Sequence, residues 1–171
     1  IALPGHYNYS SKILTNNYTW KHFDLKKIID SVEIPVFFEN NVNCMALAEH
    51  FFHSQRNENF LFFHIGRGIH CSYFYKGDIF SKENFLIGEI GHTVVNLDGQ
   101  YCECGKRGCL QTYTSETWLL KYSQSIYRNS TSTFLHQLVD TESELSMETL
   151  LTAYDLGDPA ILKIFDNALN Y

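Results

Sequence analysis

The chain has 171 residues, of which 44% are hydrophobic and 15% aromatic. This length and composition suit one globular domain or one large lobe of a bigger protein, and they exclude a disordered tail. The formal net charge of −6 argues against nucleic-acid binding by this segment, because that binding needs Lys and Arg to neutralise phosphates. No apolar run approaches the roughly 20 residues of a membrane span, and no secretion signal is visible. A soluble, cytoplasmic protein without a membrane partner is expected.

The first half of the chain predicts an α/β arrangement. Ile34–Phe38 is a short apolar run entered through a proline, which is typical of a buried strand, and Asn41–Phe52 carries apolar residues at helical spacing. Two further strands are predicted at Asn59–Ile65 and His70–Phe80. Gly66-Arg67-Gly68 would make a tight connection between them, and a Lys-Gly-Asp turn would form a hairpin within the second segment.

The pattern becomes helical after residue 115. Three residues suit the N-cap position of a helix, namely Ser115, Ser146 and Asp158. Pro159 follows the last cap at the first helical position, where its missing N–H group costs nothing. The polar stretch Ser123–Phe134 predicts a mobile connection between helices. The C-terminal part is therefore expected to be helical.

Three of the five cysteines, Cys102, Cys104 and Cys109, lie within eight residues. An odd number of cysteines and so dense a cluster argue against a disulfide framework. Three cysteines and one histidine form a standard ligand set for structural zinc. His92 is the candidate for the fourth ligand, because an Asp-Gly turn between it and Cys102 can bring it back to the cluster. The alternative is that these are ordinary buried cysteines, as expected for Cys44 and Cys71.

The segment GEIGH at residues 88–92, followed by CECGKRGCLQ at 102–111, resembles the signature of the ROK family of repressors, open reading frames and sugar kinases. The resemblance extends over roughly the first 120 residues. ALPG near the start, FFENNVNCMALAE from Phe37 and HIGRGIHCSYFYKGDIF from His64 are similar to the family's interdomain entry, sugar-binding turn and glycine loop.

This resemblance implies a fold and a domain organisation. The fold would be an actin-like ATPase, ribonuclease H-like α/β lobe, with a loop that zinc stabilises and a helical C-terminal part. Residues 1–171 would form a single sugar-binding lobe. The chain has no initial methionine, and its end falls inside a predicted helix. We therefore expect a fragment that lacks an N-terminal phosphate-binding or DNA-binding part and the C-terminal end.

The resemblance also implies a set of sugar-binding residues. Carboxylates, amides and imidazoles that converge in a cleft recognise sugar hydroxyls. His92 would have two tasks, with one ring nitrogen on zinc and the other donating to a sugar oxygen. From the residues alone, Asn40 could instead cap the following helix, and Glu89 could be a solvated carboxylate. The expected sugar-binding set is Asn40, Asn41, Glu89, His92 and Gln111, the last replacing a glutamate of the family signature.

Two departures from the family pattern bear on catalysis. Asn41 stands where the family's kinases have the aspartate that acts as general base, and an amide cannot take the proton. General-base assistance typically contributes about 10² to 10⁴ in rate, so no residue is assigned a catalytic role. The glycine loop at Gly66, Arg67 and Gly68 would cradle a nucleotide phosphate, but His70 replaces a glycine there and obstructs the close approach of the backbone. Because Arg67 could offer compensating charge, the loop is expected to be weakened and not abolished.

Three functions follow from these expectations. The favoured one is the sugar-sensing effector domain of a transcriptional regulator, with structural Zn²⁺ and with DNA bound only through a missing N-terminal domain. The second is an ATP- and Mg²⁺-dependent kinase of hexoses or amino sugars, which would need another base. The third is a module whose zinc loop only supports folding or dimerisation. Asn41 favours the sensor over the enzyme, and the resemblance implies a homodimer.

Overall fold

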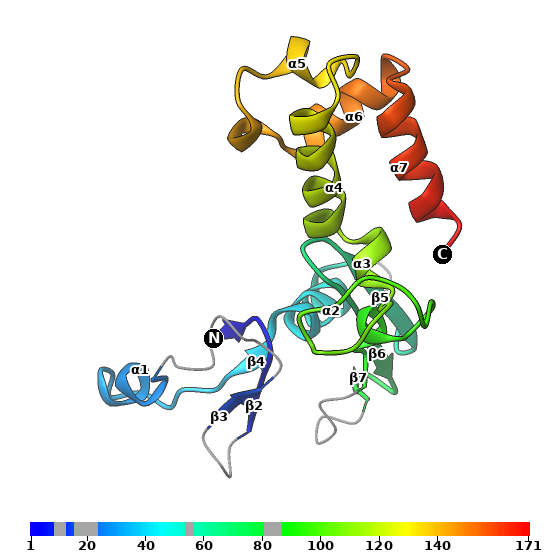
Figure 1. Cartoon of the computed structure of the whole chain (residues 1–171). Coiled ribbons are helices and arrows are strands. Elements are labelled where there is room, and N and C mark those ends of the chain that lie inside the picture. The colour runs from blue at the N-terminus through cyan, green and yellow to red at the C-terminus, as the bar shows by residue number, and fades with distance from the viewer. Residues whose placement is uncertain (9–12, 16–23, 54–56, 81–86) are drawn as a thin grey trace. The chain divides into compact units, whose positions relative to one another are not determined.

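The structure is a computed structural model that describes residues 1–8, 13–15, 24–53, 57–80 and 87–171. These residues form two compact units (Figure 1). Unit 1 comprises Ile1–His64 and His70–Glu89, and unit 2 comprises Ile65–Ile69 and Ile90–Tyr171. Among the described helices, none has both the length and the apolar composition that crossing a membrane requires.

Unit 1 begins with two small sheets and a short helix. In the first sheet β1 (Ala2–Leu3) pairs in parallel with β4 (Glu39–Asn40), and in the second β2 (His6–Asn8) pairs antiparallel with β3 (Ile13–Thr15). Helix α1 (Lys26–Asp30) lies between β3 and β4 in the chain. These elements share a small core of Leu3, Tyr7, Leu25 and Phe38, in which the Tyr7 and Phe38 rings lie 4.7 Å apart.

The strand predicted at Ile34–Phe38 is wrong. These residues are not part of a sheet, and the pairing with β1 begins only at Glu39. Pro35 has no N–H group to donate to a sheet, and the side chains of Ile34 and Phe37 are each 72% exposed. Within this run only Val36 is half-buried and only Phe38 is buried, so apolar composition alone wrongly indicated a buried strand.

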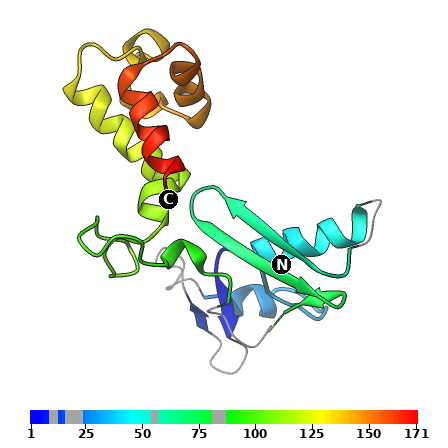
Figure 2. The ribbon, with the colours of Figure 1, turned by 90° about the vertical axis from the view of Figure 1, so that its right-hand side faces the viewer.

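The helix and the next two strands are confirmed. Helix α2 spans Asn41–Phe52, and the strands β5 (Phe60–Ile65), β6 (Ile69–Tyr75) and β7 (Asp78–Ile79) form one sheet in that order. The hairpin between β6 and β7 turns through positive φ angles at Lys76 and Gly77, 51° and 79°. Helix α2 packs on this sheet (Figure 2). The residues buried between them are Ala46, Phe74 and Ile79.

Unit 2 carries the helical part of the chain. The short 3-10 helix η1 (Ile90–His92) and the loop after it lead into α3 (Gln111–Thr114) and α4 (Glu116–Asn129). The chain continues through α5 (Leu135–Leu138), a 3-10 turn η2 (Glu142–Glu144), α6 (Met147–Asp155) and α7 (Pro159–Leu169). Helices α4 to α7 surround one core (Figure 1), made of Leu119, Leu135, Leu145, Leu150, Ala153 and Ile161.

The caps of these helices confirm two predictions and correct one. Ser146 accepts a hydrogen bond from the Thr149 N–H, and the carboxylate of Asp158 accepts from the first turn of α7 and from Thr133. Ser115 precedes α4, but its side chain makes no cap hydrogen bond. The backbone carbonyl of Ser115 accepts bonds from α4, while its hydroxyl is buried and finds no hydrogen-bond partner among the described residues.

The polar stretch Ser123–Phe134 is not a mobile connection over its whole length. Helix α4 continues to Asn129, so only the residues after it connect helices. The hydroxyl of Ser123 donates to the Leu119 carbonyl within the helix, and Ile126 packs against the core. Polar composition alone predicted a loop here. The prediction failed over Ser123–Asn129 because serine can satisfy its hydroxyl inside a helix.

Candidate functional site

The loop between η1 and α3 folds back on itself through glycines. Gly108 has a φ angle of +64°, and a Cβ atom there would lie 1.5 Å from the Asn96 carbonyl oxygen. Gly105 also has a positive φ, +88°. The N–H of Gly99 closes a turn on Asn96 at 3.1 Å. The predicted turn therefore brings the chain back, and isolated β-bridges hold it, one of them between Val94 and Cys109.

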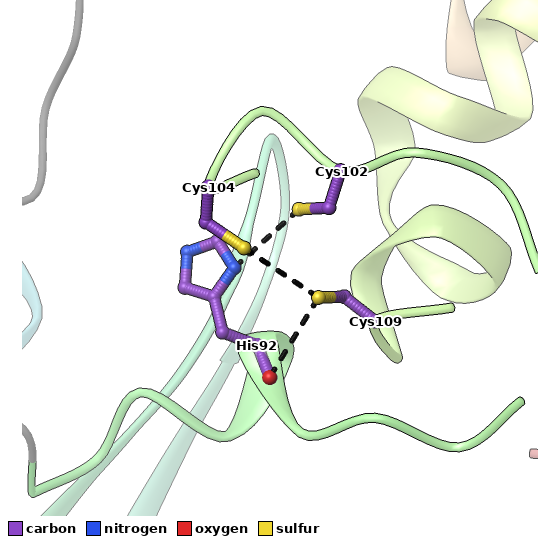
Figure 3. Close-up of side chains that lie close together, drawn as sticks. All are labelled: His92, Cys102, Cys104 and Cys109. Carbon is purple, nitrogen blue, oxygen red and sulfur yellow. Dashed lines mark hydrogen bonds between the residues drawn. The ribbon is translucent and has the colours of Figure 1, made fainter. Parts of the chain in front are cut away.

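The loop gathers His92, Cys102, Cys104 and Cys109 into one cluster (Figure 3), with their ligand atoms all within 4.8 Å of one another. The Cys104 and Cys109 sulfurs lie 3.6 Å apart, and His92 Nδ1 lies 3.5 Å from the Cys102 sulfur. In a tetrahedral zinc site with ordinary bond lengths, two sulfurs lie about 3.8 Å apart, and a sulfur and a nitrogen about 3.6 Å. The donor set and its spacing therefore fit a structural metal ion.

The protonation states of the cluster favour a cation. Burial lowers the pKa of His92, while Glu103 opposes and Lys106 adds to this effect, so the ring is neutral at pH 7, as a metal ligand must be. Burial and the neighbouring Cys104 and Cys102 raise the pKa of Cys109 to about 12. Burial also raises the pKa of Cys102. Burial acts in the same direction on Cys104, but hydrogen bonds with the Lys106 backbone and the two other cysteines outweigh it and lower the pKa of Cys104. A cation among the three sulfurs would stabilise all of them as thiolates.

Further residues brace the cluster, and the sequence analysis did not assign them this role. Lys106 Nζ donates to the His92 carbonyl oxygen at 2.7 Å. The side chain of Gln111 is buried, and its Nε2 donates to the Cys102 sulfur at 3.5 Å and to Glu103 Oε1 at 3.1 Å. Glu103 and Lys106 lie between the cysteines of the motif. This position was the one sign in the sequence that they lie close to the cluster.

The predicted residues Asn40 and Asn41 lie at the start of α2 in unit 1. Asn40 Oδ1 accepts from the backbone N–H groups of Val42 and Asn43 at 2.8 and 3.2 Å, so it is the N-cap of the helix. Its Nδ2 donates to the Gly5 carbonyl. The capping alternative for Asn40 is therefore confirmed. Asn41 is the first residue of α2 and is half-buried.

A polar network fastens the start of α2 to the sheet. Glu39 Oε1 accepts from the Asn40 N–H and from Asn43 Nδ2, both at 2.9 Å. The buried hydroxyl of Ser72 on β6 donates to Asn43 Oδ1 at 2.6 Å. Sequence analysis missed Glu39, Asn43 and Ser72 because nothing in their spacing shows that α2 and β6 meet. The network fixes Asn40, the N-cap residue, at the start of α2.

Glu89 is not a solvated carboxylate. Its Oε1 lies 3.8 Å from His70 Nδ1, and both side chains are largely buried, with 22% and 15% exposed. Gly88 allows this approach, because a Cβ atom there would lie 2.8 Å from His70 Nε2 and 2.1 Å from the Cys71 carbonyl oxygen. His70, which replaces a glycine of the family loop, therefore faces a residue of the expected sugar site.

Helix α4 holds the glycine loop through two hydrogen bonds. The Gly66 carbonyl accepts from the Glu116 N–H at 2.8 Å, and the Arg67 carbonyl accepts from the Thr117 hydroxyl at 2.8 Å. These two bonds fix the connection between β5 and β6. Among the predicted residues, the four candidate metal ligands come together in unit 2. Asn40, Asn41 and Glu89 belong to unit 1, and His92 and Gln111 to unit 2.

Comparison with known proteins gives relatives of two kinds. The chain is 30% identical over 170 residues to a xylose repressor of Bacillus subtilis, an alignment covering 98% of this chain and 40% of the repressor. It is also 30% identical over 158 residues to a glucokinase of Halalkalibacterium halodurans, covering 91% of this chain and 48% of the glucokinase. The chain thus spans less than half the length of these two relatives.

Solved structures show the same pair of classes. The crystal structure of a ROK family transcriptional regulator, a homolog of the E. coli MLC protein, matches 96% of this chain and 41% of that chain, with a TM-score of 0.74 and 27% identity. A ROK glucokinase of Streptomyces griseus in complex with glucose and AMPPNP matches 98% of this chain and 56% of that chain, with a TM-score of 0.79 and 24% identity. The second likeness bears on the fold alone.

The family itself follows from the whole chain. A model of the ROK family matches residues 1–171, beyond the roughly 120 residues that the motifs covered. The mixed α/β fold agrees with the solved ROK structures. The chain belongs to the ROK family.

Proposed function

We propose that this chain is the sugar-sensing part of a ROK transcriptional regulator. Xylose repressors and a ROK regulator of known structure are among its relatives. A sugar that binds one arrangement of such a protein more tightly than another shifts the balance between them, and operator binding follows. The DNA-binding part would lie outside these residues, since the acidic chain offers little for phosphates. We further propose a cytoplasmic homodimer.

Asn41 is the observation that carries the proposal. It opens α2 directly after the cap, where the family's kinases place their general base, and its amide takes no proton. The backbone at this point is well fixed, because Asn40 caps the helix and Glu39 binds the Asn40 N–H. The chain therefore keeps the frame of the kinase site and lacks its base, as a sensor that binds without turnover requires.

The sugar would be recognised by Glu89, His92, Asn40 and Asn41. Glu89 offers a carboxylate in a largely buried setting, and amides and imidazoles complete the set of groups that pair with hydroxyls. The Asn40 cap uses the carbonyl oxygen of the side chain and one bond from Nδ2. Because the described residues accept one bond from Nδ2, the second N–H of this amide is proposed to donate to the sugar.

The metal centre would be a structural Zn²⁺ held by His92, Cys102, Cys104 and Cys109. Bound zinc supplies a positive charge that stabilises the three thiolates. Because Nδ1 of His92 faces the cysteines, Nε2 is the nitrogen that could donate to a sugar. The ligand set thus fixes the tautomer and the direction of a residue in the expected sugar site.

Titration calorimetry on the longest natural version of the chain tests the proposal. The panel contains D-xylose, D-glucose and N-acetyl-D-glucosamine, with and without ATP, and ADP is assayed in parallel. We expect at least one sugar to bind and no ADP to form. The variant Asn41→Asp restores a carboxylate and serves as the comparison. Failure of every sugar to bind would contradict the sensor and favour a structural module.

A sugar kinase is the second candidate, because glucokinases are among the relatives and α4 holds the loop at Gly66–Gly68 in place. In that function ATP and Mg²⁺ would be required. ADP formation by the wild-type chain would support it and would mean that another group replaces the base. ADP formation only in Asn41→Asp, a gain of up to about 10² to 10⁴, would support the sensor instead.

A further inference from the structure

Gln111 lies at a junction of three segments inside unit 2. Its side chain is almost fully buried, with 5% exposed. Nε2 donates to the Cys102 sulfur at 3.5 Å and to Glu103 Oε1 at 3.1 Å, both in the cysteine loop. Its two N–H groups therefore have two acceptors, one of them a metal-ligand sulfur.

The other end of the amide faces the backbone of two glycine turns. A Cβ atom added at Gly91 would lie 2.9 Å from Gln111 Oε1, and one added at Gly68 would lie 3.6 Å from it. Gly91 belongs to η1, next to His92, and Gly68 belongs to the loop before β6. The amide is therefore enclosed by the metal loop on one side and by the two turns on the other.

An amide and a carboxylate at position 111 would act differently on the cysteine cluster. The family signature has a glutamate here, and a carboxylate has no proton to donate to the Cys102 sulfur at neutral pH. It would also place a second negative charge beside Glu103, next to three cysteines that become thiolates when metal binds. Burial makes such repulsion costly, because solvent screens it little.

We propose that Gln111 is a positioning residue of the metal centre, whose amide holds the Cys102 sulfur and Glu103 in place. This role replaces the sugar contact expected for Gln111 from the family resemblance. The inference rests on the proposed metal centre, though not on the identity of the sugar. Partners of this kind, which bind a ligand rather than the metal, commonly change metal affinity about 10- to 100-fold when they are replaced.

Two substitutions on the full chain test the role. Gln111→Met keeps the length of the side chain and removes the donor, and Gln111→Glu keeps the shape and adds a charge. Gln137→Glu is the matched control, because Gln137 is exposed on α5. Zn²⁺ affinity is measured by competition with a chromophoric chelator. Co²⁺ is then bound in place of zinc to record the thiolate-to-metal charge-transfer band.

We expect Gln111→Met to lower the Zn²⁺ affinity about 10-fold and Gln111→Glu about 100-fold, with Gln137→Glu unchanged. In Gln111→Met the cobalt band should move to longer wavelength, because a thiolate without its hydrogen bond gives up charge more readily. A general loss of packing would not move this band in a chain that still binds Co²⁺.

Three outcomes would overturn the inference. Unchanged Zn²⁺ affinity and an unchanged cobalt band in Gln111→Met would remove Gln111 from the metal centre. A loss of sugar affinity in the same variant, with the metal still bound as tightly, would restore the sugar contact. Absence of zinc binding by the wild-type chain would remove the metal centre as well, which separates the failure of the inference from that of its premise.

Discussion

At the scale of single residues, His70 makes the stability of the chain depend on pH. Burial lowers the pKa of His70 below its ordinary value of 6.5, and the nearby charge of His64 adds to the effect. The Glu89 carboxylate, 3.8 Å away, is beyond hydrogen-bond distance and does not reverse it. As the pH falls, the His70 side chain takes up a proton in the unfolded chain before it does so in the folded chain. The stability of the folded chain that depends on neutral His70 is therefore fully present above pH 6.5 and is lost below it.

The substitution His70→Gln should therefore flatten the fall in unfolding free energy between pH 7.5 and pH 5.5. Urea unfolding at several pH values, with the metal content held constant, measures this slope. The wild-type chain, measured beside the variant at each pH, is the control. An equally steep fall in His70→Gln would show that His70 does not govern the acid sensitivity.

At the scale of elements, the two serines at helix starts contribute differently. The Ser115 hydroxyl is fully buried and makes no hydrogen bond with a described residue. The Ser146 hydroxyl accepts from the Thr149 N–H at 3.2 Å. A buried polar group without a partner costs stability, whereas a serine cap adds about 1 kcal/mol.

We expect Ser115→Ala to leave the free energy of unfolding unchanged or to raise it, and Ser146→Ala to lower it by about 1 kcal/mol. Urea denaturation of both variants beside the wild type measures the difference. A loss of stability in Ser115→Ala as large as in Ser146→Ala would mean that the Ser115 hydroxyl is satisfied in solution.

Local signals predicted elements well where cap and periodicity agreed. Helix α2 begins and ends where the sequence indicated, and Asn40 is its N-cap, although Phe51 and Phe52 at its end are exposed. The same signals failed where a tertiary contact decides. Ser115 occupies a cap position without capping, and Pro35 breaks a run that looks like a strand. Which side chains turn inward depends on partners that spacing does not reveal.

At the scale of the whole molecule, the sequence predicted the cluster of candidate metal ligands and only part of its surroundings. His92 and the three cysteines could be found because turn glycines and ligand types mark them locally. The network of Glu39, Asn43 and Ser72 could not, because it joins α2 to β6 across 29 positions between Asn43 and Ser72. Contacts between distant segments arise when helices and strands pack together, and the residue types and spacing within one segment do not reveal its partner.

The division into two units predicts a local response to metal removal. Backbone bonds inside the cysteine loop, such as those from the Cys102 N–H to Lys106 and from the Gly108 N–H to Gln100, depend on a segment with little regular structure. We expect a chelator to abolish amide-exchange protection in residues 94–111, whereas β6 and α2 keep theirs. Hydrogen exchange read by mass spectrometry measures this. Unchanged exchange in the loop would contradict a structural metal.

The spacing of the thiols also limits how such experiments can be done. The Cys104 and Cys109 sulfurs lie 3.6 Å apart in the folded loop, so these two thiols can still meet when the metal is removed and the loop opens. Dissolved oxygen or peroxide converts one thiol to a sulfenic acid, and its neighbour then displaces water to form a disulfide. That bond uses up two of the four ligands and prevents the metal from returning until a reductant cleaves it. A chain stored without zinc and without a reductant would thus lose its capacity for metal until it is reduced, with no change in its sequence and a loss of mass of only two hydrogens.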